Sequence, residues 1–262
     1  MNKILLSGIA IFALGSVAVA ADYSSYSEAA EAGAAAYKAK KFEDMRSAYA
    51  QAKKFATSDH QKWHSATFEI RACREMKKWD DALKLADEYL AGTPPENLKA
   101  ATIFIKGLIF NSKGDKDKGT LLLEEALACS DLFGYIKEQA MFIVMQHYYT
   151  KQEFDKCIDR ATKIIADKAS PKSSVEYARF YIAQCKLDQK KYDECEKAVK
   201  EYAPLVEMPS IKARMTYIQA SLHLQKGENE EAVKCFEECI KNEPNGWRAT
   251  NAKKQITRIK SL

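Results

Sequence analysis

A four-residue motif recurs along this 262-residue chain at a nearly constant interval. In its clearest copies an aromatic residue is followed by an acidic residue, a polar residue and a small or slim one. The copies lie at 42–45, 79–82, 154–157 and 192–195, with weaker ones at 116–119 and 229–232. Their last residues are 37, 37, 38, 38 and 37 positions apart. A fixed period of this length indicates an array of similar structural units.

Each motif opens a segment with the apolar spacing of an amphipathic helix. In 79–90 the apolar residues follow one another in steps of three and one, which places them on one helix face. A second segment lies upstream and is apolar on several faces, as in 103–110 and 141–149. Short polar turns separate the two, and Gly114 and Gly227 suit the left-handed end of a helix.

The sequence therefore predicts an all-α chain of about six antiparallel helix pairs. One pair cannot bury its apolar stripe alone, so neighbouring pairs must stack into a solenoid. We expect a right-handed superhelix over residues 21–246 and a capping helix over 247–262. In that cap Trp247, Ile256 and Ile259 are expected to face the sixth pair.

These features resemble the tetratricopeptide repeat over about Ser27 to Pro244. The segment 178–195, ARFYIAQCKLDQKKYDEC, is similar to repeats of exported bacterial members of that family. The period of 37 to 38 exceeds the usual 34, which implies longer links between units. The resemblance implies that the first helices of successive units line a concave surface that binds a peptide or protein.

The family register assigns twelve residues to that concave face. Aromatic rings dominate the set, and amides and arginines flank them. The candidate partner-binding residues are Phe104, Phe142, Tyr149, Tyr177, Phe180, Arg214, Tyr217, Arg71, Arg74, Asn111, Gln146 and Gln184. Rings supply apolar area and amides can bond a peptide backbone. The alternative interpretation is packing between helices, and both can hold at once.

The first twenty residues predict an export signal. Lys3 precedes a largely apolar run over 4–20 that ends in an Ala-Val-Ala cleavage pattern at Ala20. We expect an exported chain, periplasmic or secreted after cleavage near Ala20. A membrane anchor is the alternative, but the run has 17 residues and contains Gly8 and Gly15, which is short for a bilayer span.

Positive charge is concentrated at the C-terminus. Residues 247–262 carry five basic residues and no acid: Arg248, Lys253, Lys254, Arg258 and Lys260. The rest of the chain is close to neutral, so no nucleic-acid partner is expected. The basic helix is interpreted as a solvated outer face or, alternatively, as a weak contact with an anionic surface.

The seven cysteines show no metal-binding or redox spacing. Cys157 and Cys195 occupy the last position of the repeated motif and are interpreted as small buried residues. Disulfides between neighbouring helices remain an alternative. Cys235 and Cys239 share one helix face, but two thiols alone are a weak metal signal.

No catalytic constellation is visible in the chain. Acids such as Asp155 recur in the first turn of each second helix, where they complement the helix dipole. His60 and His64 lie one turn apart without a ligating neighbour. We therefore expect no enzyme activity and no cofactor. The predicted function is a scaffold or adaptor of the bacterial cell envelope; the alternative is a ligand- or metal-binding, thiol-bearing accessory protein of the periplasm.

Overall fold

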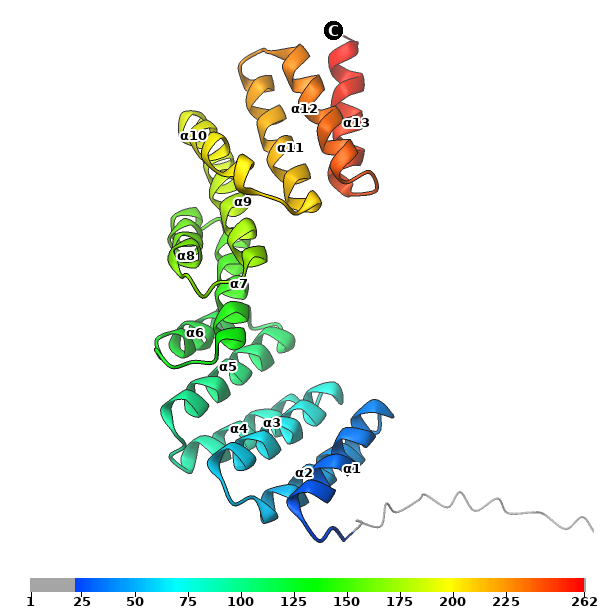
Figure 1. Ribbon diagram of the computed structural model, residues 1–262, viewed down its shortest axis with the longest axis vertical. Helices are drawn as coiled ribbons and strands as arrows, with labels where there is room; N and C mark the ends of the chain where they lie inside the picture. The colour runs from blue at the N-terminus through cyan, green and yellow to red at the C-terminus, as the bar shows by residue number, and fades with distance from the viewer. Residues whose placement is uncertain (1–21, 262) are drawn as a thin grey trace, which may run out of the picture. The chain divides into compact units, whose positions relative to one another are not determined.

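The computed structural model describes residues 22–261, and the expected signal peptide at 1–20 lies outside that range. Within it the chain forms thirteen α-helices and one short 3-10 helix, and no strand. The predicted all-α array of helix pairs is confirmed (Figure 1). The helices are α1 Tyr26–Lys38, α2 Phe42–Phe55, α3 Asp59–Glu75, α4 Trp79–Ala91, α5 Glu96–Lys113, α6 Lys116–Leu127, α7 Gly134–Thr150, α8 Phe154–Ala166, α9 Lys172–Asp188, α10 Tyr192–Tyr202, η1 Ala203–Leu205, α11 Pro209–Gln225, α12 Asn229–Asn242 and α13 Trp247–Lys260.

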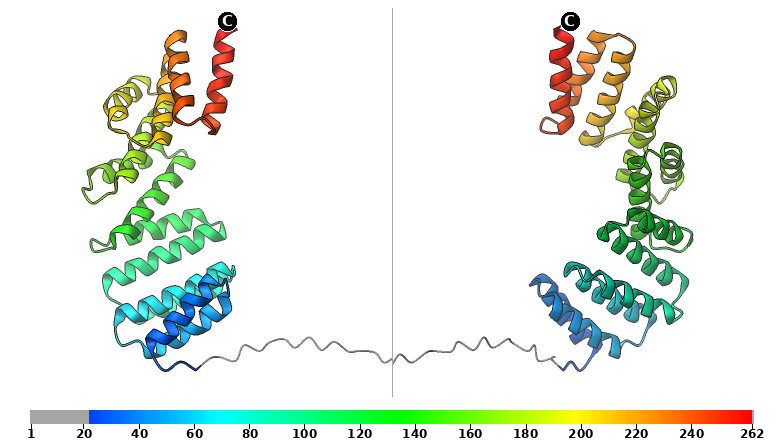
Figure 2. Two further views of the ribbon diagram at one scale, coloured as in Figure 1. Left: turned by 45° about the vertical axis from the view of Figure 1, so that its right-hand side comes forward. Right: turned by 180° about the vertical axis from the view of Figure 1, so that it is seen from behind.

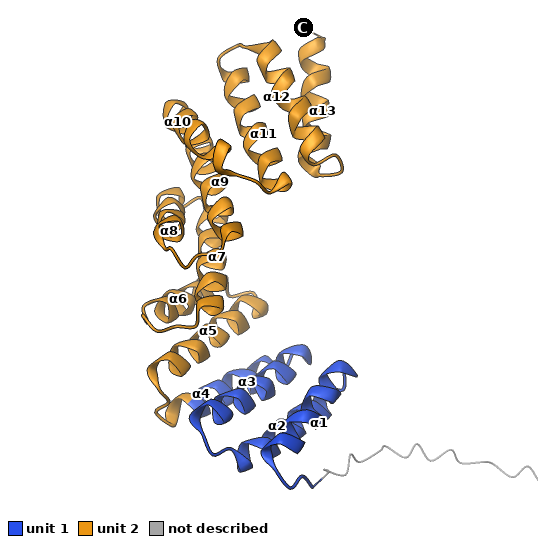
Figure 3. Cartoon of the chain, in the orientation of Figure 1, with its two compact units in different colours: residues 1–89 blue, residues 90–262 orange. Residues whose placement is uncertain are grey.

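The helices belong to two compact units, residues 1–89 and 90–262 (Figure 3). In the first unit α2 packs against both α1 and α3. Its core gathers Met45, Tyr49 and three alanines, with Phe42 and Phe68 against them. The apolar face that the first motif predicts for α2 is therefore the face that the unit buries.

The second unit repeats one packing scheme along its length. Each helix from α5 to α13 packs against the next in the chain, with α9 and α11 also in contact. In addition α5 contacts α7, α7 contacts α9, and α11 contacts α13. We call α5, α7, α9, α11 and α13 the first-helix row. The views in Figure 2 show that the helices of each pair run antiparallel.

All six final residues of the motif are buried: Met45, Ala82, Gly119, Cys157, Cys195 and Ala232. At Gly119 the two helices of the pair approach closely, because a Cβ on it would lie 2.8 Å from the carbonyl oxygen of Gly107 on α5. A small residue at this position therefore lets the two helices of a pair meet. The motif thus reflects the need for a small residue where the two helices of a pair pack together.

The turn inside every pair contains one residue with a left-handed backbone. These residues are Lys40, Lys77, Gly114, Gln152, Lys190 and Gly227, with φ between 57° and 100°. They follow one another at the motif's own intervals of 37 or 38 positions. From the sequence, only Gly114 and Gly227 were predicted to adopt this conformation, because a lysine or a glutamine does not indicate it.

Gly114→Ala tests the turn. No heavy atom lies within 4 Å of the position that a Cβ would take, so φ of 100° is the only obstacle to alanine. We expect the free energy of unfolding to fall by about 1 kcal/mol in urea denaturation. Gly134→Ala is the control, since Gly134 begins α7 with equally open surroundings and no left-handed backbone. Equal losses in both variants would contradict the turn argument.

The cysteines are core residues in this fold. All seven lie in the described range with free thiols, and five of them are buried. The Cys195 thiol donates to the carbonyl oxygen of Ala183 at 3.3 Å, and burial raises its pKa to about 12. Within residues 22–261 no group of three or more metal-ligating side chains gathers.

Helix α13 departs from the expectation at its first turn. Ile256 and Ile259 pack against the cluster formed by α11 and α12, as expected. Trp247 is not among the residues packed there: it is 61% exposed, and its ring centroid lies 6.3 Å from that of Tyr217. Four of the five basic residues are exposed, whereas Arg248 is half-buried. Arg248 therefore does not share the solvated outer face on which the other four basic residues lie.

None of the described helices combines the length and the apolarity that crossing a membrane requires.

Candidate functional site

Aromatic rings make a series of contacts along the first-helix row of the second unit. The rings of Phe142 on α7 and Tyr177 on α9 meet edge to face, with centroids 5.3 Å apart. Tyr149 on α7 meets Tyr181 on α9 in the same way at 5.2 Å. Tyr217 on α11 lies 6.3 Å from Trp247 on α13. Rings thus join neighbouring helices of the row.

The six predicted ring positions divide into two groups. Phe104 and Phe180 are only 4% and 2% exposed, so most of their surface is core. Phe142, Tyr149, Tyr177 and Tyr217 are half-buried. The packing interpretation therefore fits the first two, while the other four keep part of their surface open to solvent.

The three predicted amides have different surroundings. Asn111 packs inward, because a Cβ on Gly119 would lie 2.0 Å from its Oδ1. Gln184 donates through Nε2 to Asp188 at 3.0 Å, and the same carboxylate accepts from the Tyr149 hydroxyl at 2.8 Å. Gln146 is exposed on α7.

A shallow hollow of about 470 Å³ opens beside the Tyr149–Asp188 contact. Its lining residues are Tyr149, Thr150, Gln152, Phe154 and Asp188. Burial and the contact with Asp188 both raise the pKa of Tyr149, so its hydroxyl stays protonated and donates. The wall of the hollow thus carries a ring, a hydroxyl and a carboxylate, and the last two are hydrogen-bonded to each other.

The first unit holds the two other predicted arginines, Arg71 and Arg74 on α3. The guanidinium of Arg71 lies over the Tyr37 ring at 4.2 Å and also donates to the Tyr37 hydroxyl. The Nε of Arg74 is buried without a hydrogen-bond partner, and burial lowers its pKa. These residues form a basic and aromatic surface of that unit.

A stack of rings and guanidiniums at the end of the row joins the predicted Arg214, Tyr177 and Phe180 to Arg248 and Trp247, which sequence reasoning left out of the site. Arg214 on α11 lies over the rings of Tyr177 and Phe180, at 5.4 and 5.2 Å. Arg248 on α13 lies over Phe180 at 5.4 Å and over Trp247 at 4.7 Å. Arg248 stands 34 residues after Arg214. Interpreting α13 as the first helix of a further unit would have placed it here.

No family model matches the sequence, and no curated protein is found as a relative. Solved structures do match. YrrB, described as a TPR protein with an unusual peptide-binding site, gives a TM-score of 0.56 at 15% identity, over 79% of this chain and 97% of that one. The apo form of the quorum sensor NprR from B. thuringiensis gives a TM-score of 0.55 at 12% identity, over 89% of this chain and 68% of that one. Cut9–Hcn1, an APC/C hetero-tetramer, gives a TM-score of 0.52 at 13% identity, over 90% of this chain and 43% of that one.

The chain has the tetratricopeptide-repeat fold.

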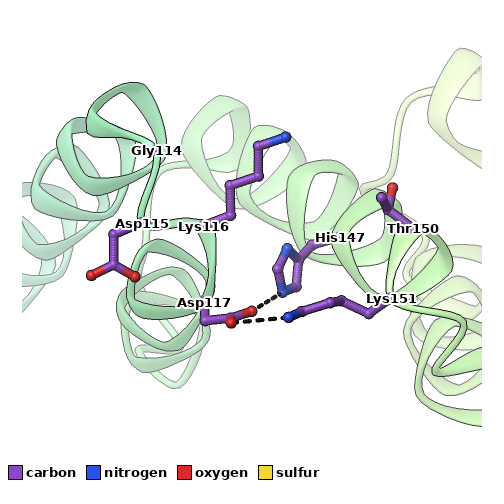
Figure 4. Close-up of a pocket in the computed structure, with 7 residues that line it drawn as sticks. All are labelled: Gly114, Asp115, Lys116, Asp117, His147, Thr150 and Lys151. Carbon is purple, nitrogen blue, oxygen red and sulfur yellow. Dashed lines mark hydrogen bonds and ion pairs between the residues drawn. The ribbon is translucent and has the colours of Figure 1, made fainter.

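Polar contacts join neighbouring helix pairs of this tetratricopeptide array. Figure 4 shows one, in which His147 Nε2 on α7 and Nζ of Lys151, the residue after α7, each lie 3.0 Å from the Asp117 carboxylate on α6. The hydrogen bond from Lys151 is the largest cause that lowers the pKa of Asp117. A hollow of about 290 Å³ lies here, but its acid and bases already satisfy one another. We assign it to packing between repeats.

Acids in the first turn of some second helices also connect the repeats. Asp155 on α8 accepts a hydrogen bond from Gln189 Nε2 at 2.9 Å, at the end of α9. Further along α8, Arg160 pairs with Glu124 on α6 at 2.6 Å. The recurring acids therefore add contacts between repeats to the expected dipole effect.

Proposed function

We propose that this protein is a non-catalytic scaffold or adaptor that binds a partner peptide or protein through the first-helix row of its second unit. The observation that carries the proposal is the run of half-buried rings on α7, α9 and α11. Such rings supply large contact area at a small cost in side-chain entropy. Phe142 and Tyr177 are its central members.

The fold supports the same conclusion by analogy. YrrB, which shares the repeat architecture, is described as having a peptide-binding site. Repeat arrays of this kind present extended concave surfaces for binding. The Tyr149–Asp188–Gln184 contacts add polar groups next to the rings, which suit the backbone of a bound peptide.

We further propose that the protein acts in the bacterial cell envelope. The support is the export pattern at residues 1–20, with its single charge, apolar run and small-residue end. Fractionation of cells that carry a C-terminally tagged full-length chain tests this proposal. Recovery of a shortened protein in the periplasm or medium is expected, and retention of the full chain in the cytoplasm would contradict it.

Capture of partners by variants of the mature protein tests the binding surface. We expect Phe142→Ala and Tyr177→Ala to reduce the partner captured from the cell envelope far more than a combined Lys253→Ala, Lys254→Ala and Arg258→Ala change. A buried aromatic anchor contributes about 2 kcal/mol or more to binding, whereas an exposed charge contributes about 0–1 kcal/mol. The amount captured is measured by quantitative mass spectrometry.

Each variant must first give a near-native melting curve, because the rings also pack on one another. The basic variant serves as the matched control, since all three of its side chains are exposed on α13. Loss of capture in that variant, with capture unchanged in the ring variants, would move the binding site to α13.

A further inference from the structure

We propose that one face of α13 binds the surface of an anionic lipid membrane. Four exposed residues form this face, Trp247, Lys253, Lys254 and Arg258, and we call it the α13 outer face. The rings that we propose to bind a partner lie on α7, α9 and α11. The α13 outer face is therefore a second surface, which the proposed function does not use.

The helix buries one side and presents the α13 outer face on the other. Ala249 and Ala252 are fully buried. Lys254 and Arg258 follow Trp247 by seven and eleven residues, so the three side chains lie within about 40° of one another around the helix axis, roughly opposite the two alanines. Packing of α13 against α11 and α12 therefore leaves this side in contact with solvent.

The protein does not neutralise the charges of this face. Among residues 22–261 no carboxylate oxygen lies within 4.0 Å of the charged nitrogens of Lys253, Lys254 or Arg258, and residues 247–261 contain no acid. Lysines on the preceding helices, by contrast, commonly pair with acids of their own or a neighbouring helix. Even Lys260, at the end of α13, lies 3.9 Å from a Glu237 oxygen. The α13 outer face is therefore a patch of unpaired positive charge, which complements an anionic partner.

The ring of Trp247 indicates which anion fits. Of the three tryptophans, Trp63 is buried and Trp79 half-buried, whereas Trp247 is 61% exposed. An indole ring favours the boundary between lipid headgroups and acyl chains, where its apolar body and its polar N–H are both accommodated. A ring on the same side of the helix as unpaired lysines therefore suits a lipid surface better than an anion dissolved in water.

The three basic residues of the face can approach a membrane together. Lys253, Lys254 and Arg258 fall within about 8 Å along the helix axis, which is one Debye length at physiological salt. Each such residue near an anionic surface strengthens binding about fivefold, so three strengthen it about a hundredfold. A nucleic acid is a poorer fit, because strong binding to it depends on many phosphate contacts. Outside 247–262 the basic and acidic residues of the chain are equal in number.

Sedimentation with lipid vesicles tests the α13 outer face. The mature protein is used, because the apolar run at 4–20 would itself insert into lipid. We expect it to bind vesicles of equal parts phosphatidylglycerol and phosphatidylcholine at least about tenfold more strongly than vesicles of phosphatidylcholine alone. The triple change Lys253→Gln, Lys254→Gln and Arg258→Gln should weaken binding to the anionic vesicles about a hundredfold. Tryptophan emission should shift to shorter wavelength on binding, and Trp247→Phe should abolish that shift.

The combined change Lys38→Gln, Lys41→Gln and Lys54→Gln is the matched control, since it removes the same charge from exposed positions of the first unit. Salt screens distant charges, so this variant should lose less than about threefold. All variants must retain the native melting curve. Equal binding to both kinds of vesicle, an equal loss in the control, or binding without a change in tryptophan emission would overturn the proposal. Tighter binding to single-stranded DNA than to the anionic vesicles would overturn it too. Capture of a partner by the ring positions is measured separately and does not depend on these outcomes.

Discussion

Gly119→Ala is expected to destabilise the second unit by about 3 kcal/mol, at the upper end of what overpacking usually costs. A Cβ at this position would lie 2.0 Å from Asn111 Oδ1 and 2.8 Å from the carbonyl oxygen of Gly107. The Asn111 side chain can rotate away, but the carbonyl belongs to the backbone of α5. The two helices must therefore separate, and the contact of Leu123 with Gly107 loosens as they do. Urea denaturation followed by circular dichroism measures the loss.

A second variant separates the two clashes of Gly119→Ala. Adding Asn111→Ala removes the side-chain clash and leaves the backbone clash, so the double variant should remain clearly less stable than Asn111→Ala alone. Gly134→Ala, at an open helix start, is the control for the glycine change itself. A Gly119→Ala midpoint equal to that of the parent would show that α5 and α6 do not approach this closely.

Glu176→Ala is expected to cost about 3 kcal/mol, because it removes the acceptor of two backbone hydrogen bonds. This glutamate on α9 is fully buried, and its Oε2 accepts from the backbone N–H groups of Glu207 and Met208 at 3.1 and 2.8 Å. Those two residues form the link into α11. Alanine would remove two hydrogen bonds to a charged group, each worth about 1.5–3 kcal/mol. Faster hydrogen exchange at the two amides and a lower urea midpoint are the measurements.

Glu176→Gln is the matched control for that variant. Its amide carbonyl can still accept from both backbone groups, so a clearly smaller loss is expected. Equal losses in Glu176→Gln and Glu176→Ala would show that the carboxylate does not hold the link through these hydrogen bonds.

The helix pairs were predictable because burial leaves a periodic record in the sequence. A position such as Cys157 or Ala232 must be small wherever two helices cross, so the motif repeats with the structure. The left-handed turn leaves no such record. Lys77 and Lys190 adopt it because one helix ends there and the next begins within a few residues. The short connection imposes this backbone conformation, and the type of side chain does not reveal it.

The candidate site was predictable only in part. The register identified the ring positions, but equivalent positions are not equally covered: Phe180 is enclosed by two arginines, whereas Phe142 keeps an open side. Arg248 was missed because counting charges grouped it with exposed neighbours such as Lys253. The position of the Arg248 side chain depends on how α13 is rotated about its axis against α11, and that rotation cannot be predicted from composition.

Packing in the second unit has a mechanical consequence. Its helices pack mainly against helices of the same pair or of the next pair along the chain. Tension on the ends of this unit would therefore detach pairs one after another, with no single point at which the whole unit yields. Each detached pair of 37 or 38 residues would lengthen the chain by about 130 Å at full extension. The array would act as an extensible tether whose increments are fixed by the period of its sequence.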